Sequence, residues 1–208
     1  MKNNIELRAF DFEVRAERDE EHGTFLTGTP IVYDAWTNLG WYDEKIADGA
    51  LADTDLKDVR FLVNHNTDMI PLARSRNNNA NSTMQMEVVD GLGMNIRVNL
   101  DVENNAEAKS LYSAVERGDI SGMSFMFTIN SDTWEDIDSD HPKRTITDIK
   151  KVMEVSAVTF PAYEQTSIST RKGFDGVLDS AKSSLESVKA ERRAIEIKKQ
   201  KIRILSEV

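Results

Sequence analysis

Hydrophobic and polar residues alternate along most of the chain before residue 160, which is the pattern of β-strands with one buried face. The alternation predicts strands over residues 5–14, 24–33, 41–46, 59–63, 82–89, 93–100, 120–129 and 145–159. Asp90-Gly91 lies between two of these strands and is typical of a hairpin turn. Residues 17–23 and 130–143 are polar and charged, and we expect a turn and a loop there.

Two segments instead have the spacing of amphipathic helices. Residues 104–117 combine an apolar face with Asn104 or Asn105 as a cap and Gly118 as a stop. From Phe174 onward, apolar residues recur every seven positions, namely Ala181, Val188, Ile195 and Ile202. The apolar stripe of this terminal helix must pack either on the body of the protein or on another chain. The predicted fold class is mainly β with α (α+β).

Charge divides the chain into two parts of opposite sign. Residues 1–170 carry 16 basic and 30 acidic side chains, whereas residues 171–208 carry ten basic and six acidic ones. We therefore expect a domain over 1–170 and an amphipathic basic helical tail over 171–208. The net charge of the whole chain is −10, which repels phosphate backbones, so we expect no nucleic-acid partner.

Composition excludes several classes of protein. The absence of cysteine removes disulfide frameworks, thiolate nucleophiles and cysteine-ligated zinc. No apolar run approaches the about 20 residues that cross a membrane, and the first residues lack the features of a signal peptide. We expect a soluble intracellular protein with no membrane partner. There is also no phosphate-cradling glycine loop and no dinucleotide motif, so we expect no cofactor.

Ser124 is the candidate nucleophile. In a strand over 122–129, alternation places Ser124 on the face opposite the core-facing Met123, Phe125, Phe127 and Ile129. Gly122 leaves room beside it for a substrate backbone. Ser121 is a rival nucleophile, but it falls on the aromatic face at the start of the strand. The alternative is that Ser124 is only a polar residue on the wet face of the strand, which is the commoner case on pattern alone.

Glu154 is a candidate for orienting a catalytic base. It interrupts an apolar strand and is expected to share a face with Val152, Ser156 and Val158. A buried carboxylate requires a partner, and an imidazole would serve. An exposed strand glutamate or a structural salt bridge is an equally good interpretation.

His65 is the candidate base, because it alone of the three histidines directly follows an apolar segment, residues 61–63. His22 and His141 lie in polar stretches typical of loop tips. A structural histidine held by hydrogen bonds is the alternative. A metal site at His65 is a weaker alternative, because no other histidine has ligand spacing to His65 and the chain has no calcium-loop pattern.

Taken together, short motifs along the chain resemble those of the prohead (capsid-maturation) serine proteases of tailed phages, a family related to the herpesvirus assemblins. The motifs are Arg8-Ala9-Phe10, Gly28 to Tyr33, Glu44 to Leu51, Val63 to Asn66, Pro71 to Ser75, Gly91-Leu92, Ser121 to Phe127, Glu154-Val155-Ser156 and Pro161-Ala162. The resemblance runs through most of residues 5–170. Each motif alone is weak evidence, but their order and spacing are specific.

The resemblance implies a small, mostly antiparallel β-barrel of the assemblin type, with surrounding helices and the long C-terminal helix. It also implies that the domain over 1–170 is a protease, with Ser124 as nucleophile, His65 as general base and Glu154 as third member. The third member is a histidine in assemblins, so a glutamate is a difference from those relatives. No sequence feature identifies the hydrogen-bond donors of the oxyanion hole. Arg74 and the loop after Phe160 are the candidates for that role.

The implied activity is cleavage of the scaffolding region of the major capsid protein, and of the protease itself near the helical tail. The implied location is the assembling procapsid in the host cytoplasm, with self-association through the C-terminal helix as a further expectation. A non-catalytic capsid assembly or scaffolding protein with the same fold is the alternative. A metal-dependent hydrolase centred on His65 is a third.

Overall fold

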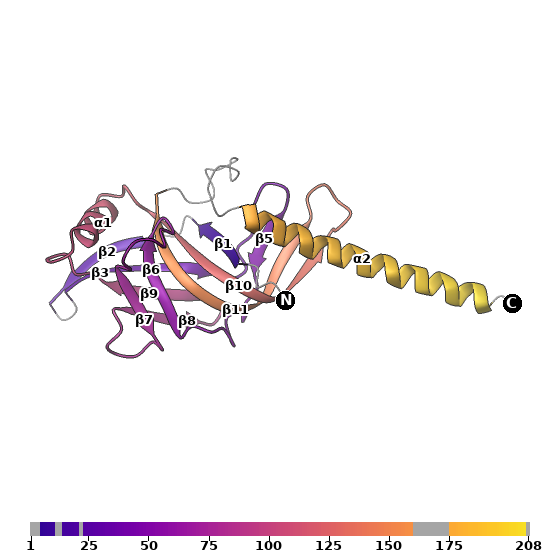
Figure 1. Cartoon of the computed structure of the whole chain (residues 1–208), viewed down its shortest axis with the longest axis horizontal. Helices are drawn as coiled ribbons and strands as arrows, with labels where there is room; N and C mark the ends of the chain where they lie inside the picture. Colours follow the sequence, from indigo (N-terminus) through magenta and orange to yellow (C-terminus); the bar gives the residue numbers. More distant parts are fainter. Residues whose placement is uncertain (1–4, 11–13, 21–22, 160–174, 207–208) are drawn as a thin grey trace.

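The computed structural model describes residues 5–10, 14–20, 23–159 and 175–206. These residues form two β-sheets, a short helix and a long C-terminal helix. Figure 1 shows the sheets gathered in one body, with the C-terminal helix lying along one end of that body and projecting beyond it.

The larger sheet has seven strands in the order β1-β10-β11-β5-β4, with β6 also paired to β11 and β7 paired to β6. Its strands are β1 (Ile5–Phe10), β4 (Thr37–Asn38), β5 (Asp43–Ile46), β6 (Asp58–Val63), β7 (Ala73–Arg76), β10 (Gly122–Glu135) and β11 (Lys143–Val158). The smaller sheet has the order β2-β3-β9-β8. Its strands are β2 (Val14–Asp19), β3 (Gly23–Val32), β8 (Met84–Val89) and β9 (Gly93–Asn99).

The main hydrophobic core joins the inner faces of the two sheets. Leu26, Ile31 and Met94 of the smaller sheet belong to the same buried cluster as Phe61 and Phe125 of the larger one. All five side chains are at most 1% exposed. Truncating a fully buried phenylalanine of this kind to alanine typically costs about 3–5 kcal/mol of stability.

Helix α1 (Ala106–Glu116) closes one end of this core. The Asn105 side chain caps it by accepting hydrogen bonds from the backbone N–H groups of Glu107 and Ala108, at 2.9 and 3.2 Å. Gly118 follows the helix with a φ of +77°, a conformation that suits glycine. The predicted helix, its asparagine cap and its glycine stop are confirmed.

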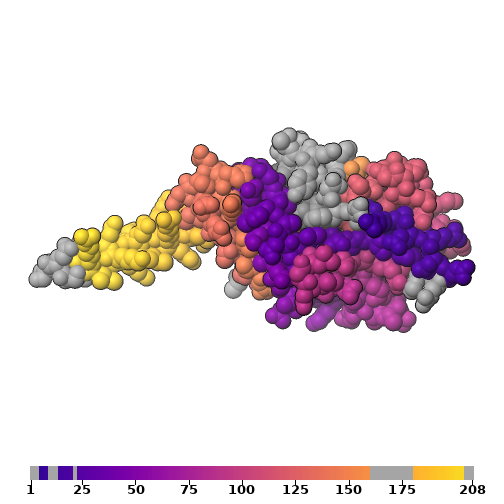
Figure 2. All heavy atoms as spheres, turned by 180° about the vertical axis from the view of Figure 1, so that it is seen from behind, coloured from indigo at the N-terminus to yellow at the C-terminus, as the bar shows by residue number. Residues whose placement is uncertain are grey.

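Helix α2 (Asp175–Ser206) confirms the predicted terminal helix. Its Ala181 and Leu185 pack into a second buried cluster with Leu39, Tyr42, Trp134 and Ile137. Further along, Ile195 and Ile202 are 53% and 67% exposed, and Figure 2 shows this part of α2 extending as an arm from the body. The apolar stripe therefore packs on the body over its first part only.

Within the described residues, no helix has the length and apolar character to cross a membrane. The expected domain boundary at residue 170 lies outside the described residues.

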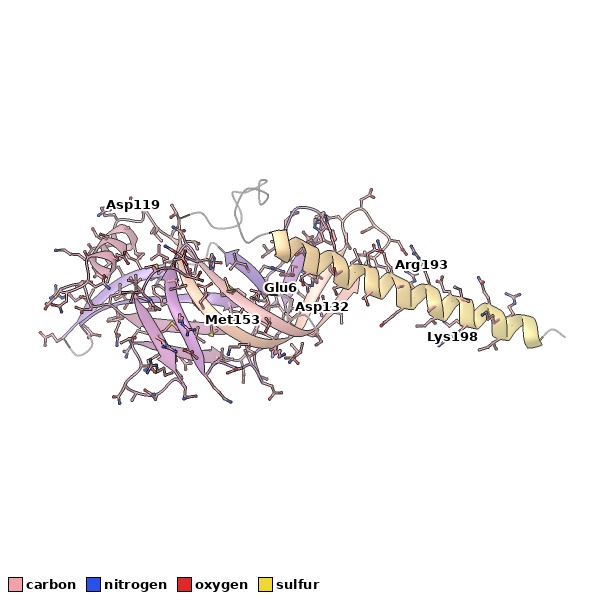
Figure 3. The ribbon with its side chains drawn as sticks, viewed as in Figure 1. Glu6, Asp119, Asp132, Met153, Arg193 and Lys198 are labelled. Atoms are coloured by element: carbon pink, nitrogen blue, oxygen red, sulfur yellow. The ribbon has the colours of Figure 1, made fainter. Side chains whose placement is uncertain are left out.

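Four buried charged side chains join β1, β5 and β11 to each other. Glu6, Arg8, Glu44 and Arg144 are each at most 3% exposed. Arg144 lies 2.8 Å from Glu6 Oε2 and 3.0 Å from Glu44 Oε2, and Arg8 pairs with both glutamates. In addition, α2 contacts this network, because Ser180 Oγ donates to Glu6 Oε1 at 3.0 Å. Figure 3 shows Glu6 and Asp132 on the side of the body where α2 begins.

A β-bulge in β11 corrects the strict alternation expected around Glu154. Met126 pairs with Glu154 while Phe127 pairs with Val152, so Met153, labelled in Figure 3, is an extra residue in β11. Val152 and Val155 both belong to the main core as a result, with 0% exposure. The expectation that Val152 shares a face with Glu154 was therefore wrong, because the bulge reverses the faces on one side of it.

Other expected boundaries also differ. The segment predicted as one strand over 5–14 is divided between β1 and β2, which belong to different sheets. Residues 17–19 continue β2 rather than forming a turn, and residues 130–135 continue β10 rather than forming a loop. Short strands β4 and β7 had no pattern long enough to predict them.

The expected closure into a barrel is wrong, whereas the expected mostly antiparallel pairing of the strands is confirmed. The two sheets are not closed into a barrel in the described part of the chain. β7 approaches β8 through the hydrogen bond from Arg74 N to Thr83 Oγ1, at 2.8 Å, but the two strands share no ladder. The exceptions to antiparallel pairing are β5 and β6, which both pair in parallel with β11. Alternation identifies the faces of a strand but carries no information on which edges pair, which is why these features were not predicted.

Candidate active site

The parallel pairing of β6 with β11 brings His65 to Glu154. Val63, the last residue of β6, lies opposite Ala157, and His65 follows two residues later. Asn64 and His65 adopt the left-handed conformation, with φ angles of 51° and 58°, so the chain turns sharply at the end of β6. The Asn64 side chain fixes this turn through hydrogen bonds of 3.0 Å to and from Thr159.

The His65 imidazole is oriented by Glu154. Its Nδ1 lies 2.5 Å from Glu154 Oε1, and the two side chains are 10% and 4% exposed. A carboxylate at this position accepts the Nδ1–H proton, which leaves Nε2 as the basic nitrogen. His65 Nε2 is buried and has no hydrogen-bond partner among the described residues.

Ser156 completes the contacts of this pair. Its Oγ donates to Glu154 Oε2 at 2.6 Å and accepts from the His65 backbone N–H at 3.1 Å. The side chain is fully buried. Ser156 was not among the predicted site residues. The signal that could have identified it is its position two residues after Glu154, on the same face of the strand.

Ser124 lies on β10, directly opposite Ser156 in the pairing with β11. Met123, Phe125 and Phe127 face the main core, which confirms the predicted division of faces. Ser124 is 0% exposed, and its Oγ donates to the backbone carbonyl of Arg8 on β1 at 2.6 Å. No hydrogen bond joins Ser124 to His65 within the described residues. Ser124 and Glu154 therefore lie on the neighbouring strands β10 and β11, and His65, in the turn after β6, contacts Glu154 from the other side of β11.

The other candidates raised from the sequence have different surroundings. Ser121 is exposed and precedes β10. Arg74 is held by Asp58, with Nε and Nη2 at 2.6 and 2.8 Å from its carboxylate, and this bond raises the pKa of Arg74. His141 Nε2 lies 2.8 Å from Asp43, and His22 lies outside the described residues. No group of three potential metal ligands occurs among the residues that the structure describes.

A pocket of about 570 Å³ adjoins the His65 turn. Asn64 and Asn66, on either side of His65, form part of its wall, and α1 forms another part. Its apolar lining includes Val63, Met69, Leu111, Ala114 and Ile120. Ile120 lies two residues before β10, the strand that carries Ser124. The pocket is therefore next to the histidine and to the start of the serine strand.

The His65–Glu154 pair, whose Nε2 has no hydrogen-bond partner in the described part of the chain, adjoins the strand next to the one that carries Ser124. A histidine held by a carboxylate in this way is the kind of base that serine hydrolases use. The sequence matches the family described as caudovirus prohead serine protease over residues 10–179, and the chain belongs to that family. It is, in general terms, a capsid maturation protease.

Among solved structures, the chain is similar to the capsid assembly protease gp21 of bacteriophage T4. The identity is 14%, with 76% of this chain and 100% of that chain covered and a TM-score of 0.42, too low to add to the assignment. No curated protein matches the chain.

Proposed function

We propose that this protein is a prohead-maturation serine endopeptidase that uses Ser124, His65 and Glu154. The observation that carries the proposal is the 2.5 Å contact between His65 Nδ1 and Glu154, which leaves Nε2 buried and, among the described residues, without a hydrogen-bond partner. Ser124 lies opposite Ser156, which contacts both residues of this pair. A base with one nitrogen held by a carboxylate and the other free is prepared to take a proton from a hydroxyl.

The mechanism is acyl transfer. The Ser124 hydroxyl turns from the Arg8 carbonyl toward His65, and Nε2 takes its proton as Oγ attacks a peptide carbonyl. Glu154 stabilises the imidazolium that forms. The proton then passes to the leaving amine, and water, activated by the same imidazole, releases the acyl group from Ser124.

The pocket beside His65 supports a polypeptide substrate. Its walls are mostly apolar, and its volume of about 570 Å³ is large enough for a bulky side chain. An extended peptide that reaches Ser124 would place an apolar side chain there. The substrates that we infer from the family are the scaffolding region of the major capsid protein and the protease itself, inside the assembling procapsid.

The basic tail is proposed to associate with the capsid precursor or with a second copy. Its charge is opposite to that of the body, and the Ile195 and Ile202 side chains are exposed on α2. Self-cleavage near the start of this helix would separate the tail from the protease.

Co-expression of the phage capsid protein with Ser124→Ala tests the catalytic role. We expect uncleaved capsid protein in assembled particles, whereas Ser121→Ala, three positions away, should cleave as the wild type does. A fluorophosphonate probe provides a second measurement, because it should phosphonylate the wild-type protein at Ser124 and leave Ser124→Ala unmodified. Normal cleavage by a folded Ser124→Ala protein would exclude the proposed nucleophile.

A non-catalytic assembly protein is the second candidate. The complete burial of Ser124 and its bond to the Arg8 carbonyl favour it, because both are what a purely structural serine would show. This candidate predicts that Ser124→Ala changes particle assembly or stability without changing capsid-protein cleavage.

A further inference from the structure

We propose that Ser156 is a positioning residue of this site, which holds the Glu154 carboxylate and the His65 turn in one fixed arrangement. The inference rests on the proposed function of Ser124, His65 and Glu154. Ser156 itself does not contact substrate in this proposal, because its hydroxyl donates to Glu154 and accepts from the His65 backbone.

The two oxygens of Glu154 have different partners. Oε1 receives His65 Nδ1 at 2.5 Å, and Oε2 receives the Ser156 hydroxyl at 2.6 Å. A carboxylate that is held at both oxygens cannot rotate without breaking one bond. Because the direction of Oε1 sets the plane of the imidazole, the Ser156 bond also fixes the direction of Nε2.

The second contact of Ser156 acts on the backbone of the histidine. Its Oγ accepts the His65 N–H at 3.1 Å, at a residue whose φ of 58° is uncommon for a side-chain-bearing residue. Such a conformation persists when its surroundings determine it. Here the Ser156 hydroxyl accepts the backbone N–H of His65 and, at the same time, holds the Glu154 carboxylate that orients the His65 imidazole.

The serine hydroxyl performs both tasks at this position. A serine oxygen donates one proton and accepts at its lone pairs, and the donor is used on Glu154 while an acceptor site is used on His65. Alanine would leave a buried carboxylate oxygen and a partly buried backbone N–H without these partners. Ser156 therefore differs from a buried serine that merely fills space.

Ser75 provides the matched control. It is also a fully buried strand serine, on β7, but its Oγ has no hydrogen-bond partner in the described part of the chain. Ser156→Ala and Ser75→Ala thus remove the same atom from equally buried positions, and only the first removes contacts to His65 and Glu154. A general effect of losing a buried hydroxyl would appear in both variants.

The test measures phosphonylation of the full-length protein by a fluorophosphonate, in which the Ser124 Oγ–P bond forms, the P–F bond breaks and His65 takes the hydroxyl proton. We expect Ser156→Ala to lower the limiting rate at saturating probe by about 10- to 100-fold, by analogy with the loss seen when the hydrogen-bond partner of a metal-ligating residue is removed. The probe concentration at half that rate should change less than about twofold, since Ser156 does not touch the probe. Ser75→Ala should leave both quantities unchanged.

The proton between His65 Nδ1 and Glu154 provides a spectroscopic measurement that does not depend on catalysis. In histidine-labelled Ser124→Ala protein, we expect a low-field proton resonance for this bond. Adding Ser156→Ala should shift or broaden the resonance, whereas adding Ser75→Ala should not. An unchanged resonance in a folded Ser156→Ala protein would overturn the inference.

Ser156→Cys keeps the test decisive if the alanine variant does not fold. The thiol fills the same space but is a weak donor and acceptor, and it would be the single cysteine of the chain. A folded Ser156→Cys protein with a limiting rate within twofold of wild type would overturn the inference. If Ser124→Ala itself remains reactive toward the probe, the proposed function fails instead, so the two failures are distinguished.

Discussion

His65 and Glu154, which are 89 positions apart in the chain, meet through a 2.5 Å contact between Nδ1 and Oε1. The contact exists because β6 and β11 run parallel and in a register that places the end of β6 beside Ser156 and Ala157. It pairs the buried Glu154 carboxylate, which would be costly to bury alone, with a largely buried imidazole whose Nε2 has no hydrogen-bond partner among the residues that the structure describes.

We predict that Glu154→Gln abolishes most activity while preserving the fold. The amide oxygen would accept the Ser156 hydroxyl, so the amide nitrogen would donate to His65 Nδ1. The imidazole would then carry its proton on Nε2, where it cannot accept one from Ser124. We expect a loss of roughly 10⁴-fold in the rate of Ser124 acylation, as for the aspartate-to-asparagine substitution in a Ser-His-Asp triad.

The measurement is the rate of capsid-protein cleavage, with the melting temperature as a test of folding. Glu87→Gln, an exposed position on strand β8, is the matched control and should cleave normally. Full activity in Glu154→Gln would remove Glu154 from the proposed mechanism.

The buried charge network predicts a large stability effect at Arg144. This side chain is fully buried and contacts Glu6, Glu44 and Asp132. Arg144→Met would leave these carboxylates without one of their cationic partners, and we expect the free energy of unfolding to fall by about 3–5 kcal/mol. Urea denaturation measures this quantity. Arg193→Met is the control, because Arg193 is exposed on α2 (Figure 3) and its loss should change stability by less than about 0.5 kcal/mol.

The acid stability of the protein should depend on Glu6. Burial by itself raises the pKa of Glu6, but Arg8 and Arg144 outweigh it and hold the pKa below the ordinary value of 4.5. A lowered pKa in the folded state means that the unfolded state binds the proton more tightly. The stability contributed by Glu6 is therefore fully present above 4.5 and is lost as the pH falls through its folded-state pKa.

Urea denaturation from neutral pH down to about pH 3 checks this prediction. We expect Glu6→Gln to be less stable than wild type at neutral pH and to lose less stability on acidification. Glu116→Gln, at an exposed position on α1, should follow the wild-type curve. Parallel curves for Glu6→Gln and wild type would show that Glu6 is not the group responsible.

The pocket beside His65 should determine how well substrate binds. Ala114 lies in its wall, and Ala114→Phe would place an aromatic ring in the space. We expect capsid-protein binding to weaken by roughly tenfold, or about 1.4 kcal/mol, with little change in the limiting rate of Ser124 phosphonylation. Ala80→Phe, at an exposed loop position, is the control. Equal binding by both variants would place the substrate elsewhere.

Much of the local structure could be predicted from residue patterns. The Asn105 cap, the Gly118 stop and the long terminal helix follow from side-chain spacing and backbone preferences, which act within a few residues. The face of Ser124 follows from alternation with the phenylalanines of β10 in the same way. By contrast, the bulge at Met153 reversed the face of Val152, because one inserted residue depends on the partner strand rather than on the local pattern.

The sequence by itself determined the type and approximate extent of most elements, the candidate histidine among three, and the resemblance to the prohead proteases. Only the tertiary structure decided that the sheets stay unclosed in the described residues, that β6 lies parallel to β11, and that Ser156 links Glu154 to the His65 backbone. The physical reason is range. Periodicity and propensity report on neighbours along the chain, whereas strand pairing and hydrogen bonds between strands depend on contacts made between distant segments when the whole core forms.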